Sequence, residues 1–401
     1  MYKHHTQCRA CRGNYLVEAF DLGVQPLANN FTTADEAKAG HAPLKLMFCP
    51  DCTLTQLSVV VRPEILYSNY CYVTSASHTM HDHFQSLWRE IKSEGNADRV
   101  MEVGSNDGRF LRFCKDQGAT DIVGIDPAAN LRPVSASRET FMTGLFTPGL
   151  AEAGKRMLGR TDVIVARHVF GHIHNWDEFM AGLDAAAYAD TLVVIEVPYV
   201  QDMLDGLEFD TIYHEHLSYI SVRAVEALLH RSNFKLVKIV RFPIHGGAIA
   251  LMLRRKSHPS PIHSSVAQYL RQEQSLTLKA WNDFGHDCGM KIDSLRSTVH
   301  GRVSVCGFGA SAKSTVWLNA CGFTRKHIAF VCDCTPQKQG RQSPGTDIPI
   351  VPESALLVEK PEAAVLFAWN FRDEIIRNNQ AYLDQGGQFL IPGIKTEVIS
   401  R

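Results

Sequence analysis

Features that would direct the protein to a membrane or to nucleic acid are missing from the sequence. No apolar run reaches the roughly 18 residues of a membrane-spanning helix, and Met1 to His5 do not lead into the apolar core of a signal peptide. Lysine and arginine (41) balance aspartate and glutamate (42), so the net charge of −1 provides no attraction for a polyanion. No coiled-coil heptad is present either. We therefore expect a cytoplasmic monomer with neither a membrane nor a nucleic-acid partner.

Length and composition indicate an ordinary globular protein of several domains. The 401 residues are enough for two or three domains, and the 45% hydrophobic and 21% charged contents are typical of globular chains. Eleven cysteines is an odd number for a disulfide framework, which favours free thiols and metal ligands.

Four of the cysteines form two Cys-x-x-Cys pairs near the N-terminus. Cys8 and Cys11 are separated from Cys49 and Cys52 by 37 residues, and each pair encloses a turn-like dipeptide. Together they supply the four thiolates that a tetrahedral zinc ion binds in structural sites. A closed site of this kind leaves no position for water, so we assign the zinc to folding and not to catalysis. The alternative is two redox-active pairs or ordinary thiols.

A strand, a glycine turn and a helix follow one another from Val100 to Lys115. The turn reads Glu102-x-Gly104-x-x-x-Gly108, and it differs from the G-x-G-x-x-G of dinucleotide sites. We therefore expect it to hold an uncharged or cationic ligand such as S-adenosylmethionine (SAM). The next strand ends at Asp126, 22 residues after Gly104, where a carboxylate usually binds ribose hydroxyls. The alternative is an ordinary αβ turn with a solvated aspartate.

The middle of the chain alternates buried strands with helices, which predicts a parallel sheet covered on both faces. Ligands of such sheets lie beyond the carboxyl ends of the strands. This rule brings a set of polar residues to one rim: Glu102, Gly104, Asp126, His168, His172 and Glu196.

Two polar stretches flank this region. Tyr70 and Tyr72 lie among serines and could bind a polar ring by stacking or form an interdomain seam. The run from Phe209 to Tyr219 contains His214-Glu215-His216, and a histidine beside a carboxylate can act as a general base. An exposed polar turn or the beginning of a metal site are the alternatives for this run.

The last third contains a second strand–glycine–helix unit. A His245-Gly-Gly turn precedes it, then a boundary region at 256–262 and one long polar helix over about 264–296. In this unit Gly307-x-Gly309 is followed by Lys313 at the start of a helix, which suits a phosphate beside an ammonium better than a redox dinucleotide. A degenerate Rossmann repeat that only packs against the first sheet is the alternative.

These motifs together resemble those of the SAM-dependent sugar C-methyltransferases, over nearly the whole chain. The resemblance is carried by Cys8-x-x-Cys11 and Cys49-x-x-Cys52, Tyr70-x-Tyr72, Glu102-x-Gly104-Ser-Asn-Asp107-Gly108, His168-Val-Phe-Gly-His172, Glu196-Val-Pro198, Tyr213-His214-Glu215-His216-Leu-Ser-Tyr219, His245-Gly246-Gly247 and Gly307-Phe-Gly309-Ala-Ser-Ala-Lys313. It implies an α/β protein with a zinc-binding domain (1–66), a class I methyltransferase domain (67–260) and a C-terminal Rossmann-like domain (261–401) that contributes to nucleotide-sugar binding.

The resemblance also implies a role for each candidate residue. His216 would be the base, supported by Glu215 and Tyr213, with His172 and Tyr70 or Tyr72 near the sugar. SAM would be held by Glu102, Gly104, Asn106, Asp107, Gly108, Asp126 and His168, and the substrate by His245, Gly246, Gly307, Gly309 and Lys313. The chain departs from the commonest form of the family at His168-Val-Phe-Gly and at Cys71, where the sugar should be recognised.

The expected substrate is a 4-keto-deoxysugar linked to a nucleotide such as dTDP or GDP, methylated on the carbon next to the ketone (C-3). Removal of the proton on that carbon needs a base and donors at the enolate oxygen, roles that histidine and tyrosine can fill. Competing functions are an RNA or other small-molecule methyltransferase, a non-catalytic protein that binds SAM and zinc, and an NAD-dependent oxidoreductase. The near-neutral charge argues against an RNA substrate, and the dense polar run at 213–216 argues against a non-catalytic protein. The missing third glycine of the second turn argues against an NAD-dependent enzyme.

Overall fold

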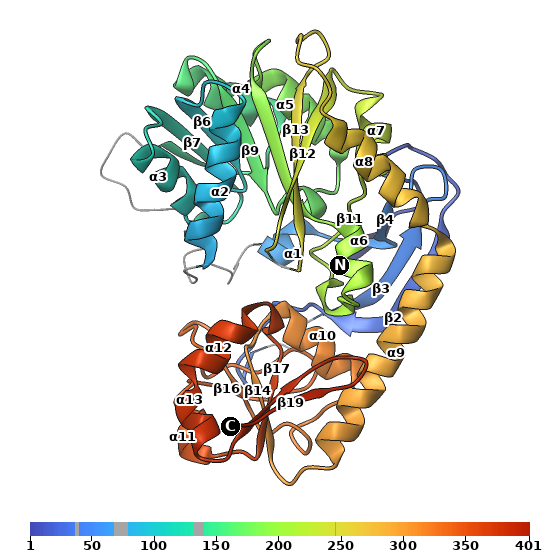
Figure 1. The fold of residues 1–401 in the computed structure, drawn as a ribbon, viewed down its shortest axis with the longest axis vertical. Helices are drawn as coiled ribbons and strands as arrows, with labels where there is room; N and C mark the ends of the chain where they lie inside the picture. The colour runs from blue at the N-terminus through green and yellow to red at the C-terminus, as the bar shows by residue number, and fades with distance from the viewer. Residues whose placement is uncertain (37–39, 68–78, 132–139, 245) are drawn as a thin grey trace.

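The computed structural model describes residues 1–36, 40–67, 79–131, 140–244 and 246–401. Figure 1 shows two helix-covered sheets, one above the other in the view, with the N-terminal strands (blue) beside the junction between them. Within the described ranges no helix is both long and apolar enough to cross a membrane.

The upper sheet has seven strands in the order β12-β13-β10-β9-β6-β7-β8. Its strands are β6 (Arg99–Val103), β7 (Asp121–Asp126), β8 (Thr140–Thr143), β9 (Val163–Arg167), β10 (Leu192–Pro198), β12 (Phe234–Phe242) and β13 (Ala248–Arg255). All neighbours are parallel except β13, which runs antiparallel to both β10 and β12. This order, with one reversed strand near the end, is the class I methyltransferase topology that the sequence predicted.

Helices cover both faces of this sheet because its strands are apolar on both sides. Val100 on β6 belongs to the buried cluster beneath α2 and α3, while its neighbour Met101 belongs to the cluster beneath α4, α5 and α7. The helices around the sheet are α2 (Thr79–Ser93), α3 (Arg109–Asp116), α4 (Pro148–Leu158), α5 (Trp176–Ala186), α6 (Val200–Asp205) and α7 (Val222–Leu229), with short 3-10 turns η2 (Ala129–Leu131), η3 (Phe170–His172) and η4 (Phe209–Thr211).

The N-terminal sheet is completed by a strand from the middle of the chain. Its order is β11-β4-β3-β2, from β2 (Val17–Pro26), β3 (His41–Phe48), β4 (Thr55–Leu57) and β11 (Ser218–Tyr219), while β1 (Tyr2–His4) pairs with β5 (Val59–Val61) and α1 spans Pro63–Tyr67. Ser218 pairs with Gln56 and Tyr219 with Thr55. The N-terminal part therefore shares a sheet with the methyltransferase part and is not a structurally separate domain.

The long helix expected over 264–296 is wrong in one respect, because it is two helices. These are α8 (Ser264–Gln272) and α9 (Leu278–His300), separated by η5 (Glu273–Ser275). The Glu273 carboxylate accepts hydrogen bonds from the backbone N–H groups of Val222 (2.6 Å) and Arg223 (2.9 Å), and Thr277 caps the start of α9. Helix α8 packs on β12 of the upper sheet, and α9 runs along the side of the molecule to the lower sheet (Figure 1).

The lower sheet is the second α/β unit that the sequence predicted. Its order is β16-β15-β14-β17-β18-β19, and only β19 is antiparallel to its neighbour. The elements are β14 (Val305–Phe308), α10 (Ala312–Ala320), β15 (Val331–Cys332), β16 (Ile350–Val351), α11 (Ala355–Glu359), β17 (Ala363–Leu366), η6 (Trp369–Phe371), α12 (Arg372–Asn378), α13 (Gln380–Asp384), β18 (Gln388–Ile391) and β19 (Glu397–Ile399).

One buried cluster joins all three parts at their junction. It contains Leu46 of β3, Phe209 of η4, Trp281 of α9 and Trp317 of α10, all at most 1% exposed. Because the cluster includes η4, the chain between Phe209 and Tyr219 lies where the three parts meet.

Candidate active site and metal centre

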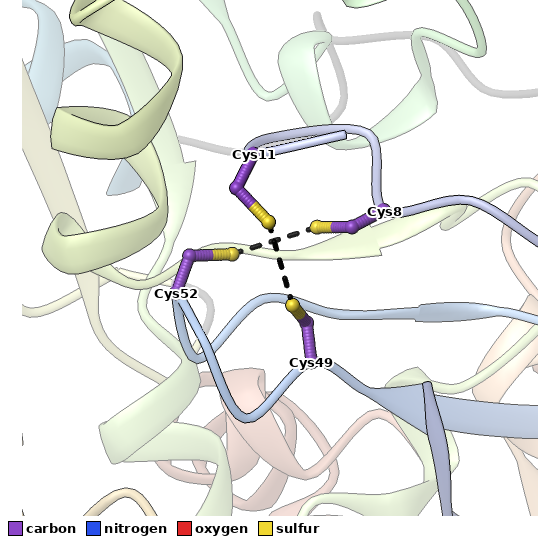
Figure 2. A group of neighbouring side chains, drawn as sticks. All are labelled: Cys8, Cys11, Cys49 and Cys52. Carbon is purple, nitrogen blue, oxygen red and sulfur yellow. Dashed lines mark hydrogen bonds between the residues drawn. The ribbon is translucent and has the colours of Figure 1, made fainter. Parts of the chain in front are cut away.

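The four predicted cysteines converge on one point. Figure 2 shows Cys8 and Cys11 on one loop facing Cys49 and Cys52 on another, with all four sulfur atoms directed inwards. The loops are similar, because the residue after each pair, Arg12 (φ 67°) or Thr53 (φ 63°), adopts the left-handed conformation that closes the turn.

The spacing of the sulfur atoms fits a tetrahedral zinc ion. Zinc–sulfur bonds of about 2.3 Å would place the sulfur atoms about 3.8 Å apart. The Sγ atoms of Cys8 and Cys52 are 3.5 Å apart, those of Cys11 and Cys49 are also 3.5 Å apart, and all four lie within 4.8 Å of one another. Four thiolates leave no open position, so this is a structural zinc site.

The zinc loops are fixed to the methyltransferase part. The buried Arg9 donates from Nη1 to the carbonyl oxygen of Leu217 (3.0 Å), and Arg231 donates to the carbonyl oxygen of Ala10 (2.7 Å). Since Leu217 directly follows His216, the metal centre contacts the predicted catalytic run.

The first glycine turn has the geometry expected of a cofactor loop. Gly104 (φ 71°) and Gly108 (φ 73°) are both left-handed, and a Cβ atom at Gly108 would lie 2.4 Å from the Phe141 ring. The N–H of Gly104 donates to the carbonyl oxygen of Ile125 (2.8 Å), which fixes the turn to the neighbouring strand. Asn106 and Asp107 lie at its partly exposed tip.

Asp126 lies beside this tip with part of its carboxylate capacity unused. One oxygen accepts the N–H of Asn106 and the other that of Ala128, each at 2.8 Å. A carboxylate offers about four lone-pair positions, so about two remain for other donors. Burial raises the pKa of Asp126 from its usual value, although the two backbone donors oppose this.

Glu102 lies beneath the turn and not at its surface. It is 0% exposed, and its Oε1 accepts two hydrogen bonds from the Arg167 guanidinium (3.0 and 2.8 Å). Burial raises the pKa of Glu102 to about 7 against the opposing effect of Arg167. Its Oε2 has no hydrogen-bond partner within the described ranges, so it is the oxygen that could reach a ligand. The sequence analysis did not include Arg167.

His168 belongs to a buried carboxylate–histidine group at the end of β9 and β10. Glu196 is 0% exposed and lies 2.7 Å from Nε2 of His83 and 3.7 Å from Nε2 of His168. Burial, and then the nearby Arg167, holds the pKa of His168 well below its usual value. His83 was missed because nothing in the pattern of its amphipathic helix distinguishes it from a core residue.

The hydrogen bonds of His216 define its tautomer. Nδ1 lies 2.7 Å from the carbonyl oxygen of Thr211 and must donate to it, which leaves Nε2 as an acceptor. The Tyr213 hydroxyl lies 2.7 Å from this Nε2 and donates to it. Burial, followed by the neighbouring His172, holds the pKa of His216 well below its usual value, so the ring is neutral near pH 7.

His172 extends this group towards the methyltransferase sheet. Its ring meets that of His216 edge to face, with centroids 4.9 Å apart, and burial lowers its pKa to about 4. Two neutral imidazoles and a tyrosine hydroxyl are therefore gathered beyond the carboxyl ends of the strands. The strand-end rule predicted this position for His172 only.

The other two members of the run face different partners. The Glu215 carboxylate, 2% exposed, accepts hydrogen bonds from Nδ2 of Asn29 at 2.9 and 2.7 Å, and burial raises its pKa to about 7. His214 faces the carbonyl oxygen of Ala42 (3.2 Å). The three side chains thus diverge, and the four cysteines are the one metal-like cluster in the described ranges. Asn29 was missed because it lies 186 residues from its partner.

The second glycine turn has fewer backbone groups available for a ligand than the first. The N–H of Gly309 donates to the carbonyl oxygen of Cys332 and that of Ala310 to Asp333, while Lys338 donates to the Ala310 carbonyl. A Cβ atom on Gly307 would lie 2.7 Å from the Phe367 ring. The turn is therefore packed against its own domain.

The remaining substrate candidates lie near the junction of the sheets. A Cβ atom on Gly246 (φ 90°) would lie 2.0 Å from Oε1 of Glu208, so this carboxylate covers the glycine directly. Nζ of Lys313 is buried and lies 3.8 Å from the centroid of the Trp369 ring. Tyr70, Tyr72 and His245 lie outside the described residues.

Comparison with known proteins identifies all three parts. Family models match residues 8–67 (zinc binding domain), 73–239 (methyltransferase domain) and 243–393 (C-methyltransferase C-terminal domain). The C-methyltransferase NovU of Streptomyces niveus is 31% identical over 408 residues, covering 98% of this chain and 97% of NovU.

Two solved methyltransferase structures each cover less than half of this chain. A SAM-dependent methyltransferase from Archaeoglobus fulgidus has 15% identity and a TM-score of 0.35, covering 44% of this chain and 94% of its own. The N-methyltransferase NodS of Bradyrhizobium japonicum, in complex with S-adenosyl-L-homocysteine, has 12% identity and a TM-score of 0.35, covering 46% and 90%. At these scores we draw nothing further from either.

Proposed function

Because the chain belongs to the SAM-dependent C-methyltransferases with a zinc-binding N-terminal domain, we propose that it methylates a nucleotide-linked 4-keto-deoxysugar. The methylated atom is the carbon next to the ketone (C-3), the nucleotide is dTDP or GDP, and the product is a branched-chain sugar. The single observation that supports this proposal best is the neutral His216 ring, whose Nε2 is held as an acceptor at the rim of the methyltransferase sheet.

SAM supplies the electrophilic methyl group in this proposal. The first glycine turn would hold it. The left-handed Gly104 and Gly108 shape this turn and pack it against Val169 and Phe141, and Asn106 and Asp107 lie at its partly exposed tip. Asp126 accepts the ribose hydroxyls through its unused lone pairs. His168 and Oε2 of Glu102, which has no hydrogen-bond partner in the described ranges, would complete the SAM site.

The proton is removed by the Tyr213–His216 pair. Nε2 of His216 is the basic atom, and the Tyr213 hydroxyl that now donates to it either yields its place to the substrate or passes the proton on. The Thr211 carbonyl stabilises the imidazolium that results, because Nδ1 keeps its hydrogen bond in both charge states. His172 and one of Tyr70 or Tyr72 position the sugar, and Glu215 supports His216 from the neighbouring position in the chain.

The nucleotide part lies towards the C-terminal domain in this proposal, with His245 and Gly246 at the sugar side. Gly307 and Gly309 act indirectly, since the backbone groups of their turn are already engaged and the turn serves to place Lys313.

The test is a panel of nucleotide-linked 4-keto-sugars incubated with SAM in deuterated water. We expect deuterium exchange at the carbon next to the ketone, followed by methylation, for one nucleotide class. His216→Asn should abolish both while its affinity for SAM stays within about twofold, because Asn keeps a hydrogen bond but cannot act as a base near pH 7. His214→Asn is the matched control and should keep turnover. Exchange that survives His216→Asn removes His216 from the base role, and no exchange with any keto-sugar overturns the substrate class.

A further inference from the structure

A lysine of the C-terminal domain lies at the junction with its ammonium group buried. Lys313 occupies the second position of α10, and its Nζ makes no hydrogen bond to any described residue. It lies over the face of Trp369, 3.8 Å from the ring centroid, which is a favourable cation–π position. Burial lowers its pKa, while Asp210 and Glu208 oppose that effect and Lys291 adds to it.

The surroundings of Lys313 are organised around Asp210. Oδ2 of this buried carboxylate accepts the indole N–H groups of Trp317 (3.0 Å) and Trp369 (2.7 Å), both from the C-terminal domain. The two indoles therefore occupy one oxygen of the acid nearest in charge to the ammonium, while its Oδ1 and Nζ of Lys313 both lack a hydrogen-bond partner among the described residues. A buried charge without a hydrogen-bond partner is costly, so its retention favours a ligand that supplies an oxygen.

The same contacts connect Lys313 to the candidate base. Asp210 precedes Thr211, whose carbonyl oxygen holds Nδ1 of His216, and both belong to η4, which packs against α10. The ammonium is close enough to His216 to act on its titration, together with His172 and His168.

Building on the proposed function, we propose that Lys313 contacts the ketone oxygen of the substrate and stabilises the enolate formed when His216 removes the neighbouring proton. The C–H bond breaks and its proton passes to Nε2 of His216, directly or through Tyr213, while the electron pair forms the carbon–carbon double bond and the ketone oxygen becomes anionic beside the ammonium. When the carbon then bonds to the methyl group, the carbonyl reforms and the methyl–sulfur pair of electrons stays on the sulfur. The proton on His216 is released to solvent.

A diphosphate oxygen would offer the ammonium the same chemistry, but the surroundings favour the enolate. A diphosphate on a glycine turn is held by several backbone N–H groups. Here the N–H groups of Gly309, Ala310 and Ser311 are already engaged with Cys332, Asp333 and Ser314. A single buried cation beside the base suits one localised negative charge better.

The experiment compares the holoenzyme with Lys313→Met, which keeps the length and removes the charge, and with Lys313→Gln as a second neutral variant. We expect a fall of about 10²–10³-fold in kcat and in the deuterium exchange rate at saturation, as for loss of an oxyanion donor. The KM for the nucleotide-sugar and the affinities for SAM and free nucleoside diphosphate should stay within about threefold. Lys326→Met is the control, because it removes an exposed lysine of the same domain and should leave kcat unchanged.

The outcomes distinguish an enolate from a diphosphate as the anion that Lys313 binds. They also distinguish failure of the lysine role from failure of the proposed function. A raised KM and weaker nucleoside diphosphate binding with normal exchange at saturation would assign Lys313 to the diphosphate and overturn the enolate role. Unchanged kinetics in a folded neutral variant would also overturn it. A nearby positive charge also predicts that the His216 pKa, followed by NMR, rises in Lys313→Met, and an unshifted pKa contradicts the proximity. If the wild type itself exchanges no keto-sugar, the proposed function fails, whereas failure of the lysine role is visible only in the variants.

Discussion

The two glycine turns of this chain have nearly the same backbone geometry and different surroundings. Gly104 donates to Ile125 and Gly309 to Cys332, both at 2.8 Å. The acid at the end of the next strand accepts a turn N–H in each case, Asp126 from Asn106 and Asp333 from Ala310. The strand–turn–helix motif alone therefore does not distinguish a ligand-binding turn from a turn that is covered by its own domain.

What differs is the segment that covers each turn. In the second unit Lys338 donates to the Ala310 carbonyl and lies 3.8 Å from Asp333, which is only 7% exposed. In the first unit Asp126 stays partly exposed at an open rim. A turn becomes a binding site when the chain leaves its donors and acceptors uncovered.

The first rim also receives groups from both other parts of the molecule. The N-terminal part supplies Asn29 and the β4–β11 pairing next to His216. In our proposal the C-terminal domain adds Lys313, and the second turn serves the first site through the helix that follows it.

The largest expected effect comes from breaking the zinc site, whose loops are attached to the methyltransferase part through Arg9 and Arg231. Cys49→Ser should lower the melting temperature by about 10 °C or more. Each kcal/mol of unfolding free energy that is lost lowers the melting temperature of a domain of about 150–250 residues by roughly 2–4 °C. Methyl transfer should be lost with it, because Arg9 connects the metal loops to Leu217. Hydrogen exchange should show lost protection at β11 and retained protection at β14.

Cys334→Ser, at an exposed cysteine of the C-terminal domain, is the control for this substitution. A metal-free protein with full stability and activity would contradict the structural role of the zinc.

The difference between the two glycine turns is tested most directly by removing the acid beside each turn, Asp126 or Asp333. Asp126→Ala should weaken SAM binding by about 10–100-fold, the equivalent of roughly 1.5–3 kcal/mol for hydrogen bonds to a charged group. Asp333→Ala should leave SAM affinity within about twofold and lower only stability. Isothermal titration with both variants measures this, and equal losses in the two would mean that the turns do not differ as described.

A smaller effect is expected from Asn29→Ala, which removes the amide that donates to Glu215. That hydrogen bond favours the ionised carboxylate, so its loss should raise the pKa of Glu215 above its value of about 7. The ionised fraction at a given pH then falls, and the acid limb of the kcat–pH profile should move to higher pH by about one unit. Asn30→Ala, at the exposed neighbouring residue, should not shift the profile. A shift to lower pH, or none, would rule out a role for ionised Glu215.

The smallest effect is expected from uncovering the second turn with Lys338→Met. The melting temperature should fall by only about 1–3 °C, as for loss of one partly exposed hydrogen-bonded pair. No affinity for NAD or SAM should appear, because Phe367 still fills the space beside Gly307. Calorimetry with each nucleotide measures this, and newly acquired binding would show that Lys338 alone keeps the second turn closed.

Local patterns in the sequence were sufficient for most of the elements and for the residues at the ends of the strands, while the roles of Tyr213 and His216 came from the family resemblance. The spacing of Cys8, Cys11, Cys49 and Cys52 determines a four-thiolate site, because two turns of this kind bring all four sulfur atoms to one ion. The alternation of apolar strands and helices determines a parallel sheet, and the sheet then delivers Gly104, Asp126 and His172 to one rim. These features depend on residues close together in the chain.

Only the tertiary structure decided which groups face one another across the three parts. Glu273 breaks the expected long helix because its carboxylate binds the start of α7, and Asn29 meets Glu215 although 186 residues separate them. The burial of Lys313 beside Trp369 and the covering of Asp333 by Lys338 depend likewise on packing. The physical reason is that periodicity encodes which face of an element is buried but not which element covers it. In this chain that covering distinguishes the candidate catalytic rim from the packed second turn.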